Sequence, residues 1–291
     1  MECRDAYADT LSALKAECEP RLIQYIVSQK MKEKHDAVRP FKPEHLVILF
    51  EKIKDSIGKK ALEPLRKIMM LESLLANWDD LFSENYPPII QQQFLMSARR
   101  FLWMCQSKKG WMSHDDEVFW KDLAIARQQM FPAGAQIVEA YSGFGFMQGL
   151  SIDPCQTFNF LKLIAHCGGR KGYYQIHTHI PDLDQFNEQG WIDCFLGIAA
   201  MLKCHKHIKG VFGGSWFYDP RLVEISPHLE YLQTIPFYNG AFRFYIGVDR
   251  TRNAFSASKK RLVLYNEGKY NPKSYLMVWP RDVLLKWASR Y

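Results

Sequence analysis

The clearest pattern in this chain lies in residues 205–280, which read HKHIKGVFGGSWFYDPRLVEISPHLEYLQTIPFYNGAFRFYIGVDRTRNAFSASKKRLVLYNEGKYNPKSYLMVWP. Apolar runs with strand character alternate there with segments whose apolar residues recur at helical spacing. The predicted elements are strands at 208–217, 241–248 and 274–279, a short helix begun by Ser226 and Pro227, and helices at 253–267 and 282–290. This order predicts a sheet that is covered by helices.

The same alternation begins upstream, near residue 132. The predicted elements of that part are strands at 136–141 and 173–180 and helices at 153–167 and 184–203. Before residue 132, the apolar residues recur at helical spacing only. We therefore predict an α+β or α/β fold, with a helical N-terminal region at 1–131 and a mixed sheet covered by helices, an acyltransferase-like domain, at 132–291.

The bulk composition is that of an ordinary globular protein, with 47% apolar and 24% charged residues. We find no signal-peptide pattern and no apolar run near the ~18 residues of a membrane span, so we expect a cytoplasmic protein with no membrane span. Seven cysteines without a CxxC pair agree with a reducing compartment. The formal charge of +7 suits an anionic ligand, whereas nucleic-acid binding is not expected because no recognisable binding motif accompanies the charge.

Residues 264–270, LYNEGKY, close the helix predicted at 253–267. In this ending the last third of the chain resembles the GCN-five-related N-acyltransferase (GNAT) superfamily, whose fourth helix often ends in a tyrosine followed by a glycine and an aromatic residue. The resemblance implies a GNAT-like fold and acyl-coenzyme A as co-substrate. It implies that Tyr265 protonates the leaving thiolate, that Asn253 binds the pantetheine arm, and that Arg221 lies where the family binds the pyrophosphate.

Two adjacent glycines, Gly213 and Gly214, interrupt the strand predicted at 208–217. Glycine is costly inside a strand unless a bulge or a close backbone approach requires it. A bulge would splay two strands and expose backbone groups to a ligand, and Gly213, Gly214, Ser215 and Trp216 would then hold the thioester and its oxyanion. The other interpretation is a packing bend against Trp216.

Two His-x-His pairs form the competing feature, His177 with His179 and His205 with His207. Alternate side chains of a strand share one face, so His177 and His179 would chelate a metal together with Asp182. The same histidines also fit a general base or a polar strand end. Glu139, a carboxylate in an apolar strand, is a further candidate base, with a solvent-facing residue as the other interpretation.

These features lead to three hypotheses. The leading one is an acyltransferase that moves an acyl group from acyl-coenzyme A or an acyl carrier protein to an amine of a small molecule or protein, without a metal. Its candidate catalytic residues are Tyr265, His177, His179 and Glu139. The alternative is a metal-dependent oxygenase or hydrolase built on a His-x-His pair. The third is a non-catalytic protein that docks a partner through the basic residues Lys30, Lys32, Lys34 and Arg39.

Overall fold

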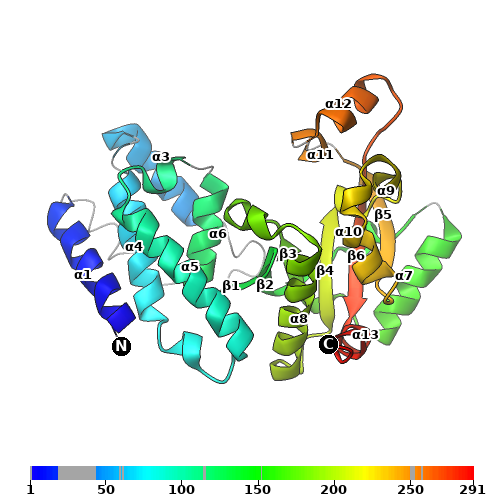
Figure 1. The fold of residues 1–291 in the computed structure, drawn as a ribbon, viewed down its shortest axis with the longest axis horizontal. Coiled ribbons are helices and arrows are strands. Elements are labelled where there is room, and N and C mark those ends of the chain that lie inside the picture. The colour runs from blue at the N-terminus through cyan, green and yellow to red at the C-terminus, as the bar shows by residue number, and fades with distance from the viewer. Residues whose placement is uncertain are drawn as a thin grey trace. The chain divides into compact units, whose positions relative to one another are not determined.

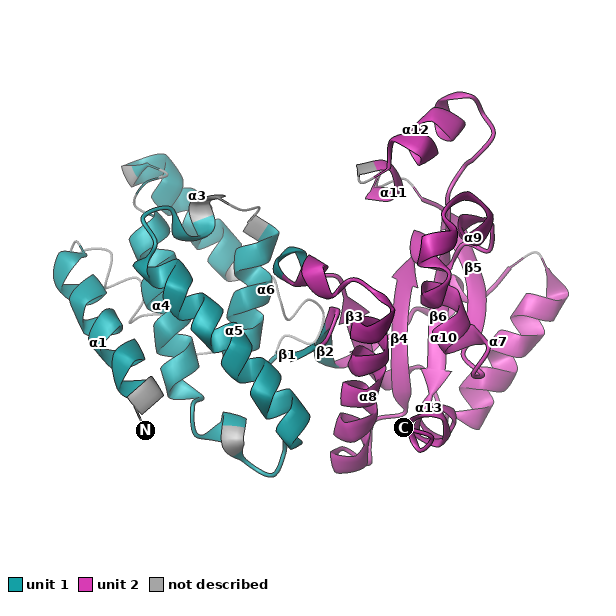
Figure 2. Ribbon diagram, in the orientation of Figure 1, with its two compact units in different colours: residues 1–133, 137–140, 179–181 teal, residues 134–136, 141–178, 182–291 magenta. Residues whose placement is uncertain are grey.

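A computed structural model describes residues 2–18, 44–58, 60, 62–113, 116–151, 153–249, 253–256 and 258–291. The chain divides into two compact units (Figure 2). Unit 1 consists of residues 1–133, 137–140 and 179–181, and unit 2 consists of residues 134–136, 141–178 and 182–291. The docking surface predicted from Lys30, Lys32, Lys34 and Arg39 lies outside the described residues.

Unit 1 is built mainly from helices (Figure 1). Its described elements include α1 (Glu2–Glu17), α3 (Glu44–Ile57), α4 (Leu62–Ala76), η2 (Asp80–Phe82), α5 (Pro88–Gln106), η3 (Gly110–Ser113) and α6 (Asp116–Ala126). Helix α4 is the centre of this unit because it contacts α1, α3, α5 and α6. Its side chains Leu65, Ile68 and Leu71 are fully buried, so α4 supplies much of the apolar core.

A mixed six-stranded sheet has the strand order β1-β2-β3-β4-β6-β5. Strand β1 and residues 137–140 of β2 belong to unit 1, and the rest of the sheet belongs to unit 2. The strands are β1 (Met130–Ala133), β2 (Gln136–Gly143), β3 (Lys171–His177), β4 (Gly210–Ser215), β5 (Phe242–Val248) and β6 (Lys273–Pro280). Strands β3 and β4 are parallel, and α8 (Glu188–Cys204) connects them along the chain. Strand β6 is antiparallel to both of its neighbours, β4 and β5. The sheet therefore combines a parallel pair, joined by a helical crossover, with antiparallel ladders.

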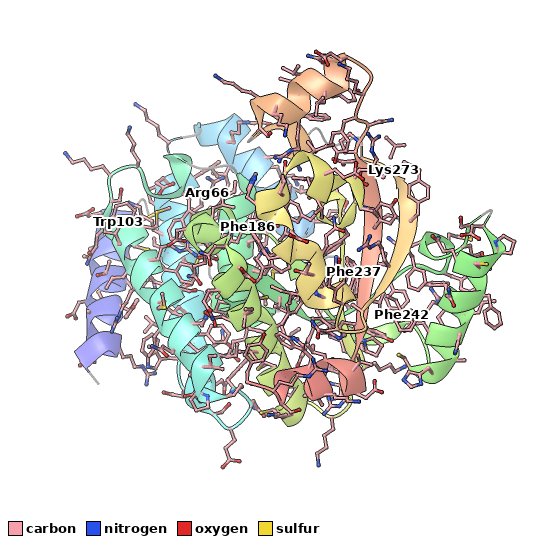
Figure 3. All side chains as sticks on the ribbon, turned by 45° about the vertical axis from the view of Figure 1, so that its right-hand side comes forward. Arg66, Trp103, Phe186, Phe237, Phe242 and Lys273 are labelled. Carbon is pink, nitrogen blue, oxygen red and sulfur yellow. The ribbon has the colours of Figure 1, made fainter. Side chains whose placement is uncertain are left out.

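Helices cover both faces of the sheet within unit 2. On one face, called the α7 face below, Phe160 and Leu163 of α7 (Pro154–His166) pack against a buried cluster that includes Tyr173, Phe212 and Phe244. On the opposite face, the rings of Phe195 from α8 and Trp279 from β6 lie 5.0 Å apart. Figure 3 shows side chains from these layers, among them Phe237 and Phe242.

Shorter helices complete unit 2. They are η4 (Phe146–Gln148), η5 (Ile180–Gln185, shared with unit 1), η6 (Trp216–Tyr218), α9 (Arg221–Ile225), η7 (Pro227–Leu229), α10 (Tyr231–Phe237), α11 (Asn253–Ser256), α12 (Lys259–Asn266) and α13 (Arg281–Ala288). Helices α11 and α12 follow β5 and precede β6 along the chain. They contact each other and form an extension that projects beyond the sheet (Figure 1).

The prediction of a mixed α/β fold is confirmed, and several boundaries differ. Strand β1 was not predicted, because it is only four residues long and contains Pro132. The helix predicted at 253–267 is two helices, because Ser258 adopts an extended conformation and its side chain caps α12 by accepting the Arg261 N–H. Among the described residues, no helix combines the length and apolar character needed to span a bilayer.

Candidate functional site

The carboxyl ends of β3 and β4 lie at the same edge of the sheet, because the two strands are parallel neighbours. Their register pairs Tyr174 with Val211 and Gln175 with Phe212, and the strands run on to His177 and Ser215. Side chains alternate between the faces of a strand. Since Tyr173 and Phe212 belong to the core on the α7 face, His177 and Gly214 also belong to that face. Two predicted site residues, His177 and Gly214, thus lie near the carboxyl ends of neighbouring strands and on the α7 face of the sheet.

Gly213 and Gly214 form no bulge, so that interpretation was wrong. Strand β4 pairs with β6 without interruption, whereas the pairing of β5 with β6 has a register shift between Tyr245 and Gly247. A Cβ atom on Gly213 would lie 2.6 Å from Cγ1 of Ile176, so Gly213 permits close packing. Gly214 is exposed, and a Cβ atom there would meet only Cδ1 of Ile246, at 3.6 Å. Gly214 thus leaves open space beside the strand.

Ser215 and Trp216 fix the chain where β4 ends. The Ser215 hydroxyl accepts a hydrogen bond from the Phe217 N–H at 3.1 Å and caps η6. The Trp216 ring is buried, and the guanidinium carbon of Arg261 lies 4.9 Å from its centroid. These contacts give both residues a clear structural role at the predicted site.

Arg261 anchors α12 to this region. Its Nε donates to the Ala254 carbonyl at 2.5 Å and its Nη1 donates to the Ser226 hydroxyl at 3.0 Å. Burial lowers the pKa of this guanidinium, which nevertheless remains a cation. Tyr265 lies one turn further along α12, where its ring packs 4.6 Å from the ring of Phe255 and 43% of its surface is exposed. Asn253 is exposed at the first position of α11.

Basic side chains from α9 and α12 lie near the same segment. Arg221 begins α9, is exposed, and donates from Nη2 to the Lys269 carbonyl at 3.0 Å. Lys260 of α12 reaches back to the Ile225 carbonyl, which its Nζ meets at 2.8 Å. These contacts tie α9 to the α12 segment. They leave exposed positive charge on both helices.

His179 does not share a strand face with His177, as the metal hypothesis required. Strand β3 ends at His177, and His179 lies in unit 1, where it is 1% exposed. Its Nε2 hydrogen-bonds to Oδ1 of Asp122 at 2.8 Å. This contact orients the ring toward α6 rather than along the strand. The prediction that His177 and His179 chelate a metal from one face of a strand is therefore wrong, because His179 lies beyond the end of β3.

Asp122 is the centre of a buried polar cluster in unit 1. Arg100 of α5 donates to its two oxygens at 2.7 and 2.8 Å, and the Trp111 indole N–H donates to Oδ2 at 2.8 Å. Burial opposes ionisation of this carboxyl, but the charge of Arg100 and the hydrogen bonds from His179 and Arg100 outweigh it and lower its pKa to about 2. Asp122 is thus a carboxylate that joins α5, η3, α6 and the segment at His179.

Two further predicted residues, Glu139 and Asp182, lie on elements other than β3 and β4. Glu139 is buried on β2 and belongs to unit 1, so the solvent-facing interpretation was wrong. Asp182 lies in η5 and belongs to unit 2, unlike its predicted co-ligand His179. Within the described part of the chain, no three His, Cys, Asp or Glu side chains are grouped closely enough to hold a metal ion.

A groove of about 610 Å³ lies on unit 2 and was missed by sequence reasoning. One wall comes from η4 and the following loop, with Met147, Gln148, Leu150 and Ser151, and the other comes from Tyr245 and Ile246 of β5. Almost a hundred residues separate the two walls in sequence. The exposure of the apolar residues Phe146 and Met147 is known only from the structure, so the sequence offered no signal for this groove.

Asp122, Arg100 and Arg261 were likewise missed. A charged residue within the apolar run of α6, FWKDLAIA, is the pattern that could have identified Asp122 as buried and paired. A scan against known protein families, a search of curated proteins and a search of solved structures each found no match for this chain.

Proposed function

We propose that unit 2 is an acyltransferase on a GNAT-like fold, which binds an acyl thioester at the carboxyl ends of β3 and β4 and moves the acyl group to an amine. The observation that carries the proposal is the parallel pair of β3 and β4. The two strands pair at Tyr174–Val211 and Gln175–Phe212, and both continue beyond these pairs, to His177 and Ser215. In open α/β sheets, ligands bind in the crevice outside the carboxyl ends of parallel strands.

Gly214 supports a close approach of the donor to the backbone of β4. It is exposed, it has no side chain, and open space surrounds the position of its missing Cβ apart from Ile246. A pantetheine arm carries amide groups, which can pair with strand backbone as an added strand does. The thioester at the end of this arm would then lie beside His177, on the α7 face.

The charge around α9 and α12 suits the phosphate groups of coenzyme A. Arg221, Lys259, Lys260 and Lys269 are exposed there, and Arg261 fixes α12 against Trp216 at the end of β4. Guanidinium and ammonium groups form charge-assisted hydrogen bonds with phosphate oxygens. In this proposal Arg221 and Asn253 contribute to binding of the donor. An acyl carrier protein would present the same phosphopantetheine arm.

The proposed reaction joins the amine to the acyl carbon. The lone pair of the amine attacks the thioester carbonyl and forms the C–N bond, and His177 accepts the proton that the nitrogen loses and releases it to solvent. The C–S bond then breaks, and the thiolate takes a proton from Tyr265, which recovers it from solvent. A backbone N–H group of β4 that faces β3 beyond Phe212, where the pairing of the two strands ends, stabilises the intermediate oxyanion. The acceptor is a primary amine of a small molecule or a protein.

The test is a transfer assay with acetyl-coenzyme A and a panel of amines that includes amino acids, polyamines and lysine peptides. Mass spectrometry should quantify free coenzyme A and acylated amine, because the exposed thiols of Cys155 and Cys204 would react with a thiol reagent. We expect amine-dependent release of coenzyme A. His177→Gln should reduce turnover by about 10²–10⁴-fold and leave donor binding intact.

The matched control is His207→Gln, which changes an exposed histidine outside the proposed site. It should retain turnover. Calorimetry with coenzyme A and acetyl-coenzyme A tests the donor separately. The proposal fails if neither compound binds at millimolar concentration.

A further inference from the structure

The groove between η4 and β5 has an uncharged lining. Met147, Leu150 and Ile246 are apolar, Tyr245 presents an aromatic ring, and Gln148 and Ser151 are polar without charge. Its volume of about 610 Å³ falls within the range of roughly 300–1,000 Å³ that is usual for small-molecule sites. These properties fit an extended apolar chain better than a charged group.

The wall of the groove on β5 is held in place by α7. Gln156 donates from Nε2 to the Tyr245 carbonyl at 3.1 Å, and its Oε1 accepts from the Tyr245 N–H at 2.9 Å. The side chain thus occupies the two backbone groups of Tyr245 that a peptide strand would otherwise pair with. The opposite wall is held by Gln148, whose Oε1 accepts from the Gly145 N–H at 2.7 Å. This arrangement disfavours an added peptide strand as the occupant.

Ile246 connects the groove to the proposed donor site. It lines the groove, and its Cδ1 lies 3.6 Å from a Cβ atom built on Gly214 at the end of β4. Both Ile246 and Leu150 also pack against the core on the α7 face, the face to which His177 belongs. An alkyl chain that extends from a thioester carbonyl beside Gly214 and past Ile246 would therefore enter the groove.

We propose that this groove binds the acyl chain of the donor, so that the preferred thioester carries a medium or long alkyl chain rather than an acetyl group. The inference rests on the proposed acyltransferase function and specifies its donor. Each buried CH₂ group tightens binding about four-fold. Octanoyl-coenzyme A should therefore bind at least ~50-fold more tightly than acetyl-coenzyme A, which corresponds to about three buried CH₂ groups.

The test is calorimetry of the full chain with coenzyme A, acetyl-coenzyme A and octanoyl-coenzyme A. Met147→Asp, at a side chain that is 76% exposed, places a carboxylate at the groove without disturbing the core. The ratio of octanoyl to acetyl affinity should fall at least ten-fold in this variant. Leu150→Ser is the second variant, and it should lower the same ratio. Met96→Asp, at an exposed methionine of α5, is the matched control and should keep the ratio.

The possible failures are distinguishable. Equal affinities for the acetyl and octanoyl thioesters would overturn the groove as the chain site while the acyltransferase proposal stands. A chain-length preference that Met147→Asp and Leu150→Ser leave unchanged would place the chain elsewhere and overturn the inference as well. Absence of binding by all three compounds would remove the proposed function and the inference together.

Discussion

His179 hydrogen-bonds to Asp122 at 2.8 Å although the two residues are 57 positions apart in sequence, and both side chains are fully buried. Arg100 and Trp111 bond to the same carboxylate. One aspartate thus satisfies donors from three other segments of unit 1. A buried charge of this kind is tolerated only when it is paired and hydrogen-bonded.

Asp122→Asn should destabilise the fold by about 3–5 kcal/mol, because it removes the charge that Arg100 faces and leaves buried donors without an acceptor. Urea unfolding at neutral pH measures this change. Asp79→Asn is the matched control, since Asp79 pairs with Arg4 at an exposed surface and should cost at most ~1 kcal/mol. Equal stability of the two variants would show that the Asp122 cluster contributes little.

The depressed pKa of Asp122 predicts that the free energy of unfolding depends on pH in the acidic range. The carboxyl has a pKa of about 2 in the folded protein and 3.8 as its ordinary value, so the unfolded chain binds the proton more readily. The resulting stabilisation, about 2 kcal/mol, is complete above pH 4 or so and is lost as the pH falls through about 2. The stability difference between wild type and Asp122→Asn should therefore shrink between pH 4 and pH 2. A constant difference over this range would contradict the assignment.

The two glycines of β4 should respond differently to alanine. Gly213→Ala should destabilise the fold by about 1–3 kcal/mol, because the new methyl group would overlap Cγ1 of buried Ile176. Gly214→Ala should change stability by less than about 0.5 kcal/mol, since its nearest contact is an ordinary one with Ile246. The same variant should weaken acyl-coenzyme A binding. Thermal unfolding and calorimetry measure the two effects, and a reversed order of stability would contradict the packing described for Gly213.

Tyr265→Phe should lower turnover while donor affinity stays within about two-fold, because the variant removes only the hydroxyl that returns a proton to the thiolate. The phenylalanine ring preserves the contact with Phe255. Tyr238→Phe, at an exposed tyrosine that follows α10, is the control and should keep turnover. An unchanged rate in Tyr265→Phe would show that the thiolate takes its proton from solvent and not from Tyr265.

Local signals in the sequence predicted much of unit 2. Asp153 followed by Pro154 marks the start of α7, and the Asp153 side chain does accept the Cys155 N–H. The first and last residues of β2, β5 and β6 were also predicted correctly to within two residues. These features depend on neighbours in the chain, which is why a single sequence reveals them.

Contacts between distant segments were not predictable in the same way. His179 has a strand-like spacing from His177, but Asp122, which bonds to it, belongs to α6. The groove depends on a loop at 147–151 that meets β5, and no pattern within either segment identifies the other. The helix break at Ser258 has a local signal, a serine that can cap, but the apolar residues on both sides favoured one continuous helix.

Hydrogen–deuterium exchange with and without octanoyl-coenzyme A tests most directly whether unit 2 holds an acyl thioester at the ends of β3 and β4. We predict slower amide exchange in peptides that cover 171–178 and 210–217, with the helices of unit 1 unaffected. Unchanged exchange in both peptides at saturating thioester, or protection confined to unit 1, would contradict the proposed site.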